Sequence, residues 1–430
     1  MDLRSSNNRL LALAVVVVAV WKYVQRRKYL REVEEKTGGI PGTLGWPGLG
    51  ETIDFATNSR VFVEARARQH GKVFKTNLMG ANMVYVTSPE LAEHVYNSKD
   101  FGQGTFSTFI ELFGDFLLVK NGKEHERPRR LITHALADSA LKSNLPYFIK
   151  EISASVDRWR GRQVFIMAEL KLMLIHVMSK ILISDLPSAL IETTSKDLDA
   201  FGKGFFAAPI KASFTEYGKA LQARARLIKM IEGQVQKRRS DPAKYAGFTD
   251  VFQNYVSFVD PDTNAEHSAS FIAQNVLVAI FGSVDTTASA MASCILLANQ
   301  HPECLKRMAE EFRTFFGGDH PFSADSTTLD QLACLHYMNA FICEVMRVRS
   351  PFTAAFRQAV RDAPLPGTNF TVPEGWLVGI SQDYAFRSSV KNFPEAAAFK
   401  PERFMPGGVS FTHSDFKHAL YPFGKGAHIW

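Results

Sequence analysis

The stretch SASFIAQNVLVAIFGSVDTTASAMASCILLAN at residues 268–299 reads as one continuous helix, and it decides what kind of fold this chain can adopt. Its centre, Val276 to Phe281, is apolar on every side, so we expect the helix to be buried. At about 1.5 Å per residue it spans more than about 40 Å, enough to cross a whole domain. The sequence therefore predicts a helical body organised around this buried element.

Polar residues interrupt the centre of this helix, and they need partners because burying an unpaired polar group costs free energy. The hydroxyl of Thr286 can donate to the carbonyl of Gly282, four residues earlier. Gly282 has no side chain, so a ligand could approach the backbone closely there. Asp285 stands beside them and could relay protons. A polar kink packed against another helix explains the same residues equally well.

Helical patterns dominate the rest of the chain. Residues 123–239 read mostly as amphipathic helix, and we expect the basic stretch 219–239 to be a solvated surface helix. A hairpin is expected over residues 72–86, with its turn at the Gly-Ala-Asn of residues 80–82. Four phenylalanines between Phe106 and Phe116 recur at helical spacing, which is typical of a core stripe or of a pocket lining. The fold class expected is mainly α with a smaller β portion.

Composition excludes several classes of protein. The chain has 430 residues with 46% hydrophobic and 12% aromatic residues, which argues against disorder. Its net charge is 50 − 43 = +7, without a dense basic run, so we expect no nucleic-acid partner. The four cysteines form no C-x-x-C pair and are interpreted as reduced thiols, not as metal ligands. They are Cys294, Cys304, Cys334 and Cys343.

The N-terminus carries a membrane signal. Leu10 to Trp21 is an uncharged apolar run of about 18 Å as a helix, shorter than a hydrocarbon core of about 30 Å. More Lys and Arg follow this run than precede it, which predicts an anchor whose C-terminal side faces the cytoplasm. A signal peptide or an interfacial helix is the alternative. We assign residues 1–36 to the anchor and its basic flank and residues 37–50 to a Pro/Gly hinge, although an ordinary loop fits that composition as well.

Charged residues that could act together lie far apart in the sequence. Glu344 and Arg347 share one helix face, and Arg403 follows in a turn, so the three could form one buried network. His125, Arg129 and Arg357 read individually as surface groups or local ion pairs. Arginine is nevertheless the natural partner of a buried pair of carboxylates.

The order of these motifs, ending on Pro422-Phe423-Gly424-Lys425-Gly426-Ala427-His428-Ile429-Trp430, resembles a microsomal cytochrome P-450 over essentially the whole chain. The last residues are similar to the start of the haem loop, F-x-x-G-x-[RH]-x-C. Gly282–Thr287 is similar to the oxygen-activation motif, and Glu344–Arg347 with Arg357 to the K-helix signature. The segment at residues 44–47 and His125 lean toward the retinoid, sterol and brassinosteroid oxidases.

The resemblance implies a monooxygenase that inserts one oxygen atom from O2 into a small lipophilic substrate. It implies haem b, electrons from NADPH through a membrane reductase, and a location on the endoplasmic reticulum membrane with the catalytic domain, residues 51–430, facing the cytoplasm. The residues implied to contact haem are His125, Arg129, Arg357, Phe423, Gly426 and His428. Those implied to handle protons and dioxygen are Gly282, Asp285 and Thr286, and those implied to hold the haem-side core together are Glu344, Arg347 and Arg403. The stripe Phe106–Phe116 falls in the segment that caps the substrate pocket.

Position 430 departs from the family pattern, because Trp430 stands where the axial cysteine is required. An indole offers an N–H donor and no free lone pair for iron. We therefore expect a chain cut short at its haem ligand, without the segment that follows, retaining little haem and showing no turnover. A haem-free, membrane-anchored remnant or lipid-binding pseudoenzyme is the alternative function. A gene-model artefact that splits the cysteine codon is the alternative to a real truncation.

Overall fold

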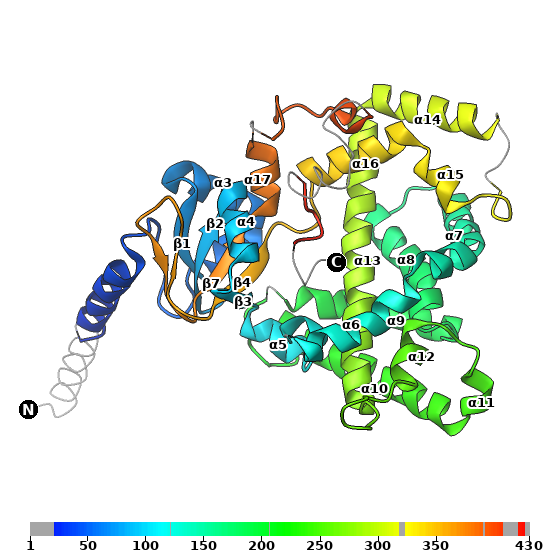
Figure 1. Ribbon diagram of the computed structural model, residues 1–430, viewed down its shortest axis with the longest axis horizontal. Helices are drawn as coiled ribbons and strands as arrows, with labels where there is room; N and C mark the ends of the chain where they lie inside the picture. Colours follow the sequence, from blue (N-terminus) through cyan, green and yellow to red (C-terminus); the bar gives the residue numbers. More distant parts are fainter. Residues whose placement is uncertain are drawn as a thin grey trace, which may run out of the picture.

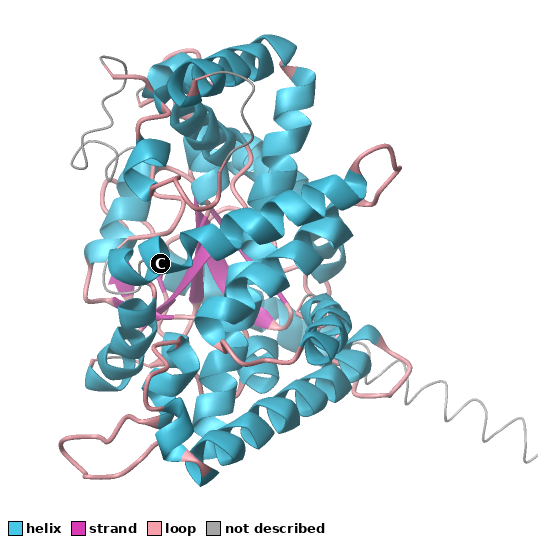
Figure 2. Cartoon of the chain, turned by 90° about the vertical axis from the view of Figure 1, so that its right-hand side faces the viewer, coloured by secondary structure: helices cyan, strands magenta, loops and turns pink. Residues whose placement is uncertain are grey.

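The structure is a computed structural model that describes residues 21–120, 122–205, 207–317, 323–389, 392–406 and 420–425. A lobe built on a small sheet lies beside a larger body of helices, and helix α13 (Ala269–Gln300) runs through that body (Figure 1). A view turned by 90° shows the strands behind and between helices (Figure 2). The expected fold class, mainly α with a smaller β portion, is confirmed.

The elements alternate unevenly along the chain, with most strands near its two ends. The remaining helices are α2 (Thr52–Thr57), α3 (Ser59–His70), α4 (Pro89–Asn97), α5 (Ser107–Phe113), α6 (Lys123–Ala135), α7 (Asp138–Trp159), α8 (Ile166–Leu182), α9 (Ser188–Lys203), α10 (Glu216–Ser240), α11 (Pro242–Tyr245), α12 (Val251–Val256), α14 (Pro302–Phe316), α15 (Leu329–Ala333), α16 (His336–Val348) and α17 (Gln382–Ser388), with 3-10 turns η1 (Leu117–Val119) and η2 (Pro401–Phe404). The strands are β1 (Val73–Leu78), β2 (Ala81–Val86), β3 (Phe101–Gln103), β4 (Ala355–Ala359), β5 (Ala363–Pro364), β6 (Thr371–Val372) and β7 (Leu377–Ile380).

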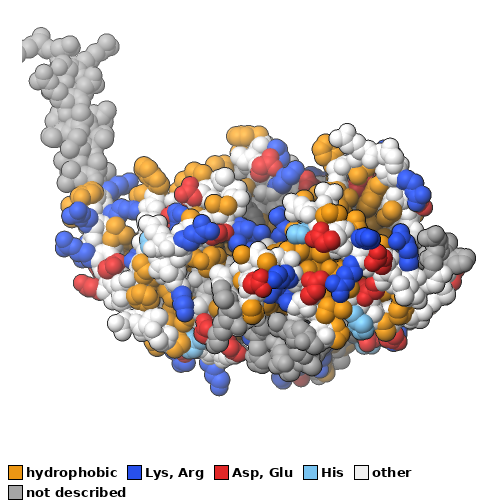
Figure 3. Space-filling model, turned by 90° about the horizontal axis from the view of Figure 1, so that it is seen from above, with side chains coloured by type: hydrophobic (Ala, Val, Ile, Leu, Met, Phe, Trp, Pro, Cys, Tyr) orange, Lys and Arg blue, Asp and Glu red, His pale blue; other side chains and the backbone are white. Residues whose placement is uncertain are grey.

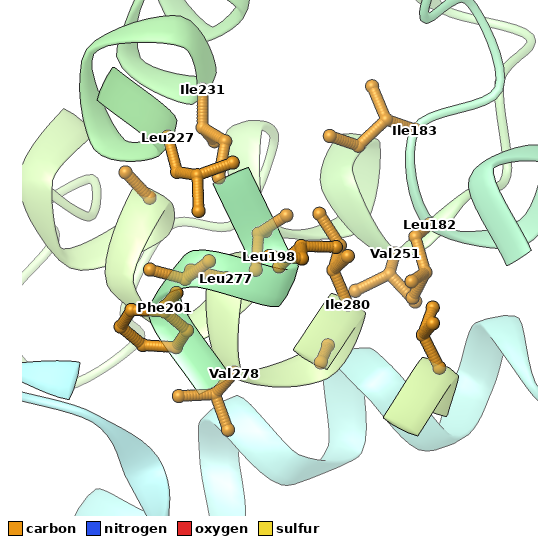
Figure 4. Packing of buried hydrophobic residues seen from close by; sticks show 14 of the residues in the cluster. Leu182, Ile183, Leu198, Phe201, Leu227, Ile231, Val251, Leu277, Val278 and Ile280 are labelled. Atoms are coloured by element: carbon orange, nitrogen blue, oxygen red, sulfur yellow. The ribbon is translucent and has the colours of Figure 1, made fainter. Parts of the chain in front are cut away.

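Helix α13 forms for the reasons its sequence indicates. Ser268 caps it by accepting a hydrogen bond from the backbone N–H of Phe271, and the helix ends at His301, before Pro302. Its N-terminal half is buried from Ile272 to Ile280 apart from Gln274, in a core shared with α8, α9 and α10 (Figure 4). Within the described residues it is the single helix long and apolar enough to span a membrane, but α8 and α10 pack along it, as around a core helix.

The main sheet joins segments from both ends of the chain in the order β1-β2-β7-β4-β3. β1 and β2 form the predicted hairpin, but its turn lies at Met79 and Gly80, two residues with positive φ, and not at residues 80–82. β7 pairs parallel with β2 and antiparallel with β4, which brings Arg357 into the middle of the sheet lobe. A second pair, β5 and β6, stands apart from this sheet.

The prediction of a solvated basic helix at 219–239 is wrong for one face of α10. The side chains of that face are buried against α9 and α13, namely Tyr217, Ala220, Ala223, Leu227, Ile231, Val235 and Arg238. Arg238 is only 1% exposed, because its guanidinium binds Asp250 through Oδ1 at 2.8 Å and Asp185 through Oδ1 at 2.6 Å. A charge count cannot separate such a buried, paired arginine from the exposed lysines on the same helix.

The stripe between Phe106 and Phe116 does not lie on one helix. Phe106 precedes α5, and α5 ends at Phe113, where Gly114 takes a φ of +81°. The helix is held by α10, since Arg224 Nε donates to the carbonyl of Leu112 at 2.7 Å. A side chain from α13 holds the next residues, because Asn275 Oδ1 accepts from the N–H of Leu117 at 2.8 Å. The segment is therefore fixed to the helical body by buried hydrogen bonds.

Glu344, Arg347 and Arg403 form one buried cluster in the structure. Glu344 Oε2 lies 2.7 Å from Arg347 Nε, and its Oε1 lies 3.3 Å from Arg403 Nε. Both guanidinium groups also donate to carbonyls of residues 394–398, so the cluster ties α16 to the irregular segment before η2. Glu344 and Arg347 have no exposed side-chain area, so water cannot replace any of these hydrogen bonds if one is lost.

We predict that Glu344→Gln lowers the free energy of unfolding by about 3–5 kcal/mol, because it leaves two buried arginines without their carboxylate. The matched control is Glu310→Gln, which removes an exposed carboxylate 3.9 Å from Lys306 and should cost less than about 1 kcal/mol. Urea unfolding followed by circular dichroism measures both. Equal losses for the two variants would contradict the prediction.

Candidate functional site

The centre of α13 is the first part of the site. Thr286 Oγ1 donates to the carbonyl of Gly282 at 2.7 Å, which confirms the hydrogen bond predicted from their spacing. Ser283 Oγ donates to the carbonyl of Ile280 at 2.9 Å. The burial pattern changes at this point, because Gly282, Asp285 and Thr286 are half-buried and Thr287 is exposed. A helix that crosses the body thus exposes hydroxyl groups at its centre, where an open face leaves room for a ligand.

Asp285 has a partner that the sequence did not reveal. Its Oδ1 lies 2.5 Å from the ammonium group of Lys171 on α8. Lys171 also approaches Asp199 on α9 at 3.5 Å, and Asp199 pairs with Lys203 at 2.8 Å, so four charges link α13 to the edge of α9. The ion pair with Lys171 holds the carboxylate of Asp285 toward α8. A single lysine early in the apolar sequence of α8 was the only available signal.

The two cations expected on α6 lie close to each other. His125 is buried and Arg129 half-buried, one helical turn apart. Burial, and then the charge of Arg129, lower the pKa of His125, so its neutral imidazole is favoured at neutral pH. In this neutral form one ring nitrogen of His125 is a donor and the other is an acceptor.

Arg357 on β4 is the most informative of the predicted cations. It is 8% exposed, and its Nη1 donates to the carbonyl of the neighbouring Phe356 at 2.9 Å. Within the described residues no carboxylate pairs with it, and burial lowers its pKa. A buried guanidinium is costly without an anion. The position is therefore suited to a carboxylate from a bound ligand.

The segment Leu420–Lys425 leads into the predicted haem loop. Leu420 and Tyr421 are buried in the core of the sheet lobe, and Gly424 turns the chain with a φ of +84° while its N–H donates to the carbonyl of Tyr421. Phe423 is 57% exposed. Gly426, His428 and Trp430 lie outside the described residues. In Figure 1 this segment, in red, runs between the sheet lobe and α13.

An aromatic wall adjoins the polar centre of α13. Phe281 directly precedes Gly282. The centroid of its ring lies 4.9 Å from that of Phe205, 5.4 Å from that of Phe201 and 5.8 Å from that of Phe113. The ring of Phe109 lies 4.6 Å from that of Phe205, and Phe106 connects it to Phe356 on β4. The rings of the wall come from α5, α9, the residues just after α9, and α13.

Phe113, Phe201 and Phe205 are buried, so the half-buried Phe109 and Phe281 are the rings that can offer an apolar side to a lipophilic ligand.

The described residues fit the two carboxylates of haem but not the axial ligand of its iron. A porphyrin with two carboxylates matches the buried Arg357 and, on α6, the cation of Arg129 with His125 as a neutral donor. The cysteines give no match for the iron's axial thiolate at the predicted loop, because all four precede residue 344 in the sequence, namely Cys294, Cys304, Cys334 and Cys343. We therefore derive no chemical step through the iron.

Comparison with known proteins agrees with this geometry. The family model described as Cytochrome P450 matches residues 40–429. The putative cytochrome P450 120 of Synechocystis sp. is 28% identical over 395 residues, covering 90% of this chain and 84% of that protein. Abscisic acid 8'-hydroxylase 1 of Oryza sativa subsp. japonica is 26% identical over 411 residues, covering 94% and 83%.

A solved structure described as retinoic acid-bound cyanobacterial CYP120A1 matches with a TM-score of 0.81 at 25% identity, covering 91% of this chain and 87% of that one. Sequence, fold and the arrangement around α13 thus point the same way. The chain belongs to the cytochrome P450 family, whose members are haem-containing oxidoreductases that act as monooxygenases and typically take electrons from NADPH through a reductase.

Proposed function

We propose that this chain descends from monooxygenases that insert one oxygen atom from O2 into a small lipophilic substrate of terpenoid, sterol or retinoid type. The observation that carries the proposal is the open polar centre of α13, with Thr286 bonded to Gly282, directly beside the phenylalanine wall. Two of the similar proteins are named for abscisic acid and retinoic acid, which are both isoprenoid carboxylic acids. The wall suits the hydrocarbon part of such a molecule.

The proposed roles follow from what each residue can do. Bound haem supplies the oxygen chemistry. Arg357, with His125 and Arg129, binds the porphyrin carboxylates. Thr286 holds a proton at its Oγ1 beside the open face, and Asp285, which is paired with Lys171, stands next to it as the proton relay. The phenylalanine rings exclude water and orient the apolar substrate.

We propose that the chain is held at the endoplasmic reticulum membrane by residues 1–36, with residues 51–430 on the cytoplasmic side, and that a membrane reductase is its electron donor. The exposed basic residues after the apolar run support this orientation, since Lys22, Arg27, Lys28 and Arg31 would meet anionic headgroups. Figure 3 shows basic side chains gathered at that end of the molecule.

Residues 37–50 connect the proposed anchor to the sheet lobe. The helical residues before them are fastened to β1, because Lys75 Nζ lies 2.8 Å from Glu34 Oε2 and also donates to the carbonyl of Ile40. The Arg26 guanidinium donates to the carbonyl of Gly45. These contacts support a fixed orientation of the described part of the proposed anchor relative to the sheet lobe. Residues 37–50 are the segment that connects the two.

A second candidate function follows from Trp430. The indole cannot replace a thiolate on iron, so we propose that this chain does not itself turn over substrate. A haem-free, membrane-anchored protein that still binds a lipophilic molecule through the phenylalanine wall is the alternative. The two candidates differ in whether the polypeptide retains haem.

A reduced carbon monoxide spectrum separates these candidates. We predict that residues 1–430, expressed with a haem precursor, reduced and exposed to carbon monoxide, retain little haem and show no thiolate-type Soret band, because no described cysteine reaches the site and position 430 is tryptophan. A thiolate-type band in this preparation would overturn the assignment of Trp430 to the ligand position.

Ligand binding tests the phenylalanine wall without any requirement for haem. We predict that Phe281→Ala weakens the binding of retinoic acid by roughly tenfold or more, because a ring that contacts three others at the open face is lost. Quenching of intrinsic fluorescence measures the dissociation constant. Phe315→Ala, which removes a half-exposed ring on α14, is the control and should leave it unchanged. Equal affinity of the wild type and Phe281→Ala would argue against the wall as the substrate surface.

A further inference from the structure

Two side chains outside the predicted site, the buried Gln382 and the half-buried Tyr96, connect its separate parts. Gln382, at the start of α17, is 2% exposed, and its Nε2 donates to the hydroxyl of Tyr96 at 2.7 Å and to the carbonyl of Tyr421 at 3.1 Å. Tyr96 lies on α4, and Tyr421 opens the segment that leads into the predicted haem loop. One amide group therefore holds α4 and residues 420–425 at a fixed separation.

The ring of Tyr96 also supports Arg357. The guanidinium carbon of Arg357 lies 5.0 Å from the centroid of this ring, a cation–π arrangement that is strengthened by burial. Burial raises the pKa of Tyr96, so its hydroxyl stays protonated and the ring remains neutral. Arg357 is thereby oriented by an aromatic face and not by a carboxylate, which leaves its charge available to a ligand.

The strand beside Arg357 carries a second sign of a missing ligand. Gln103 on β3 is the register partner of Arg357 on β4. Its Oε1 is buried and accepts no hydrogen bond from the described residues. Buried polar atoms in native proteins nearly always have partners, so an unpaired acceptor next to an unpaired cation marks a place where a polar ligand or water belongs.

Residues 420–425 are fastened to the same two helices by further contacts. The ring of Tyr421 meets Tyr96 edge-on at 5.8 Å and Phe386 of α17 at 4.9 Å. Lys425 lies over the Tyr421 ring at 4.7 Å, and its Nζ approaches Glu93 of α4 at 3.8 Å. The segment is thus packed against α4 and α17 on one side.

We infer that Tyr96 and Gln382 are positioning residues that set the distance between Arg357 and residues 420–425, so that a single porphyrin with two carboxylates can contact both. This inference rests on the cofactor site of the proposed function. Removing the Gln382 amide frees the segment at residues 420–425. Removing the Tyr96 hydroxyl breaks the same connection and keeps the ring under Arg357.

A porphyrin without iron tests this inference independently of the axial ligand. Metal-free protoporphyrin IX and its dimethyl ester are titrated separately into the wild-type chain, Tyr96→Phe and Gln382→Leu, and binding is followed by fluorescence anisotropy. We expect the wild type to prefer the acid. Tyr96→Phe should reduce that preference roughly fivefold, the effect of one lost hydrogen bond, and Gln382→Leu should reduce it further, because it loses the bonds to both Tyr96 and Tyr421. The double variant should lose no more than Gln382→Leu alone, because that variant already lacks both bonds.

Amide hydrogen exchange of residues 420–425, measured by mass spectrometry without porphyrin, is the second readout. Gln382→Leu should accelerate exchange there, and Tyr96→Phe should do so to a smaller extent because Tyr421 keeps its other contacts. Tyr147→Phe is the matched control, since it removes a tyrosine hydrogen bond, 3.3 Å to the carbonyl of His176, between α7 and α8. It should change neither readout.

The two readouts separate failure of this inference from failure of the proposed function. Unchanged amide exchange at residues 420–425 in Gln382→Leu overturns the inference, whatever the result of the porphyrin titrations. A wild type that does not distinguish the acid from the ester counts against the cofactor site, and exchange alone then decides whether Gln382 holds the segment. Faster exchange together with a reduced acid preference supports both.

Discussion

The rest of the structure depends on how α13 is buried. The first half of this helix is enclosed by other helices, and its polar centre, which follows directly, is partly open. Ile272 to Ile280 can be buried only if helices cover the element on several sides, and α8, α9 and α10 do so. From Gly282 onward that cover is incomplete and leaves an open face, since Gly282, Asp285 and Thr286 are half-buried and Thr287 is exposed. The remaining architecture keeps this face at a fixed distance from the sheet lobe that carries Arg357.

Ion pairs fix contacts between elements where apolar packing alone would allow sliding. The buried cluster around Glu344 joins α16 to the segment before η2, and the half-buried Lys171 joins α8 to Asp285 of α13. Ion pairs of this kind add little net stability, because desolvation offsets most of the attraction. Their geometric demands are strict, however, so they select one arrangement of the elements they connect. In this protein they lie where the helical body meets the parts of the site.

Patterns within one element were readable from sequence, whereas contacts between elements were not. The apolar run of α13 and the β-rich residues of β1 and β2 are local signals, and each predicted its element. Arg238 and Lys171 appeared as ordinary charges in helices, because nothing near them in the chain shows that Asp250 or Asp285 faces them. The network around Glu344 was partly readable, because Glu344 and Arg347 share one helix face, but the spacing does not show that Arg403 reaches them. Tyr96 and Gln382 carry no motif, so no sequence signal could have found them.

The structure keeps features that reduce its own stability unless a ligand is bound. Arg357 is buried without a carboxylate, Gln103 holds an unpaired acceptor beside it, and α13 exposes Thr287 at the centre of a core helix. Sequences break the rules of burial and pairing chiefly at functional sites. A ligand carboxylate would compensate for the buried charge of Arg357, whereas the acceptor of Gln103 requires a donor such as a water molecule. Membership of the family rests on the match over residues 40–429, and the loss of activity proposed from Trp430 is a separate claim.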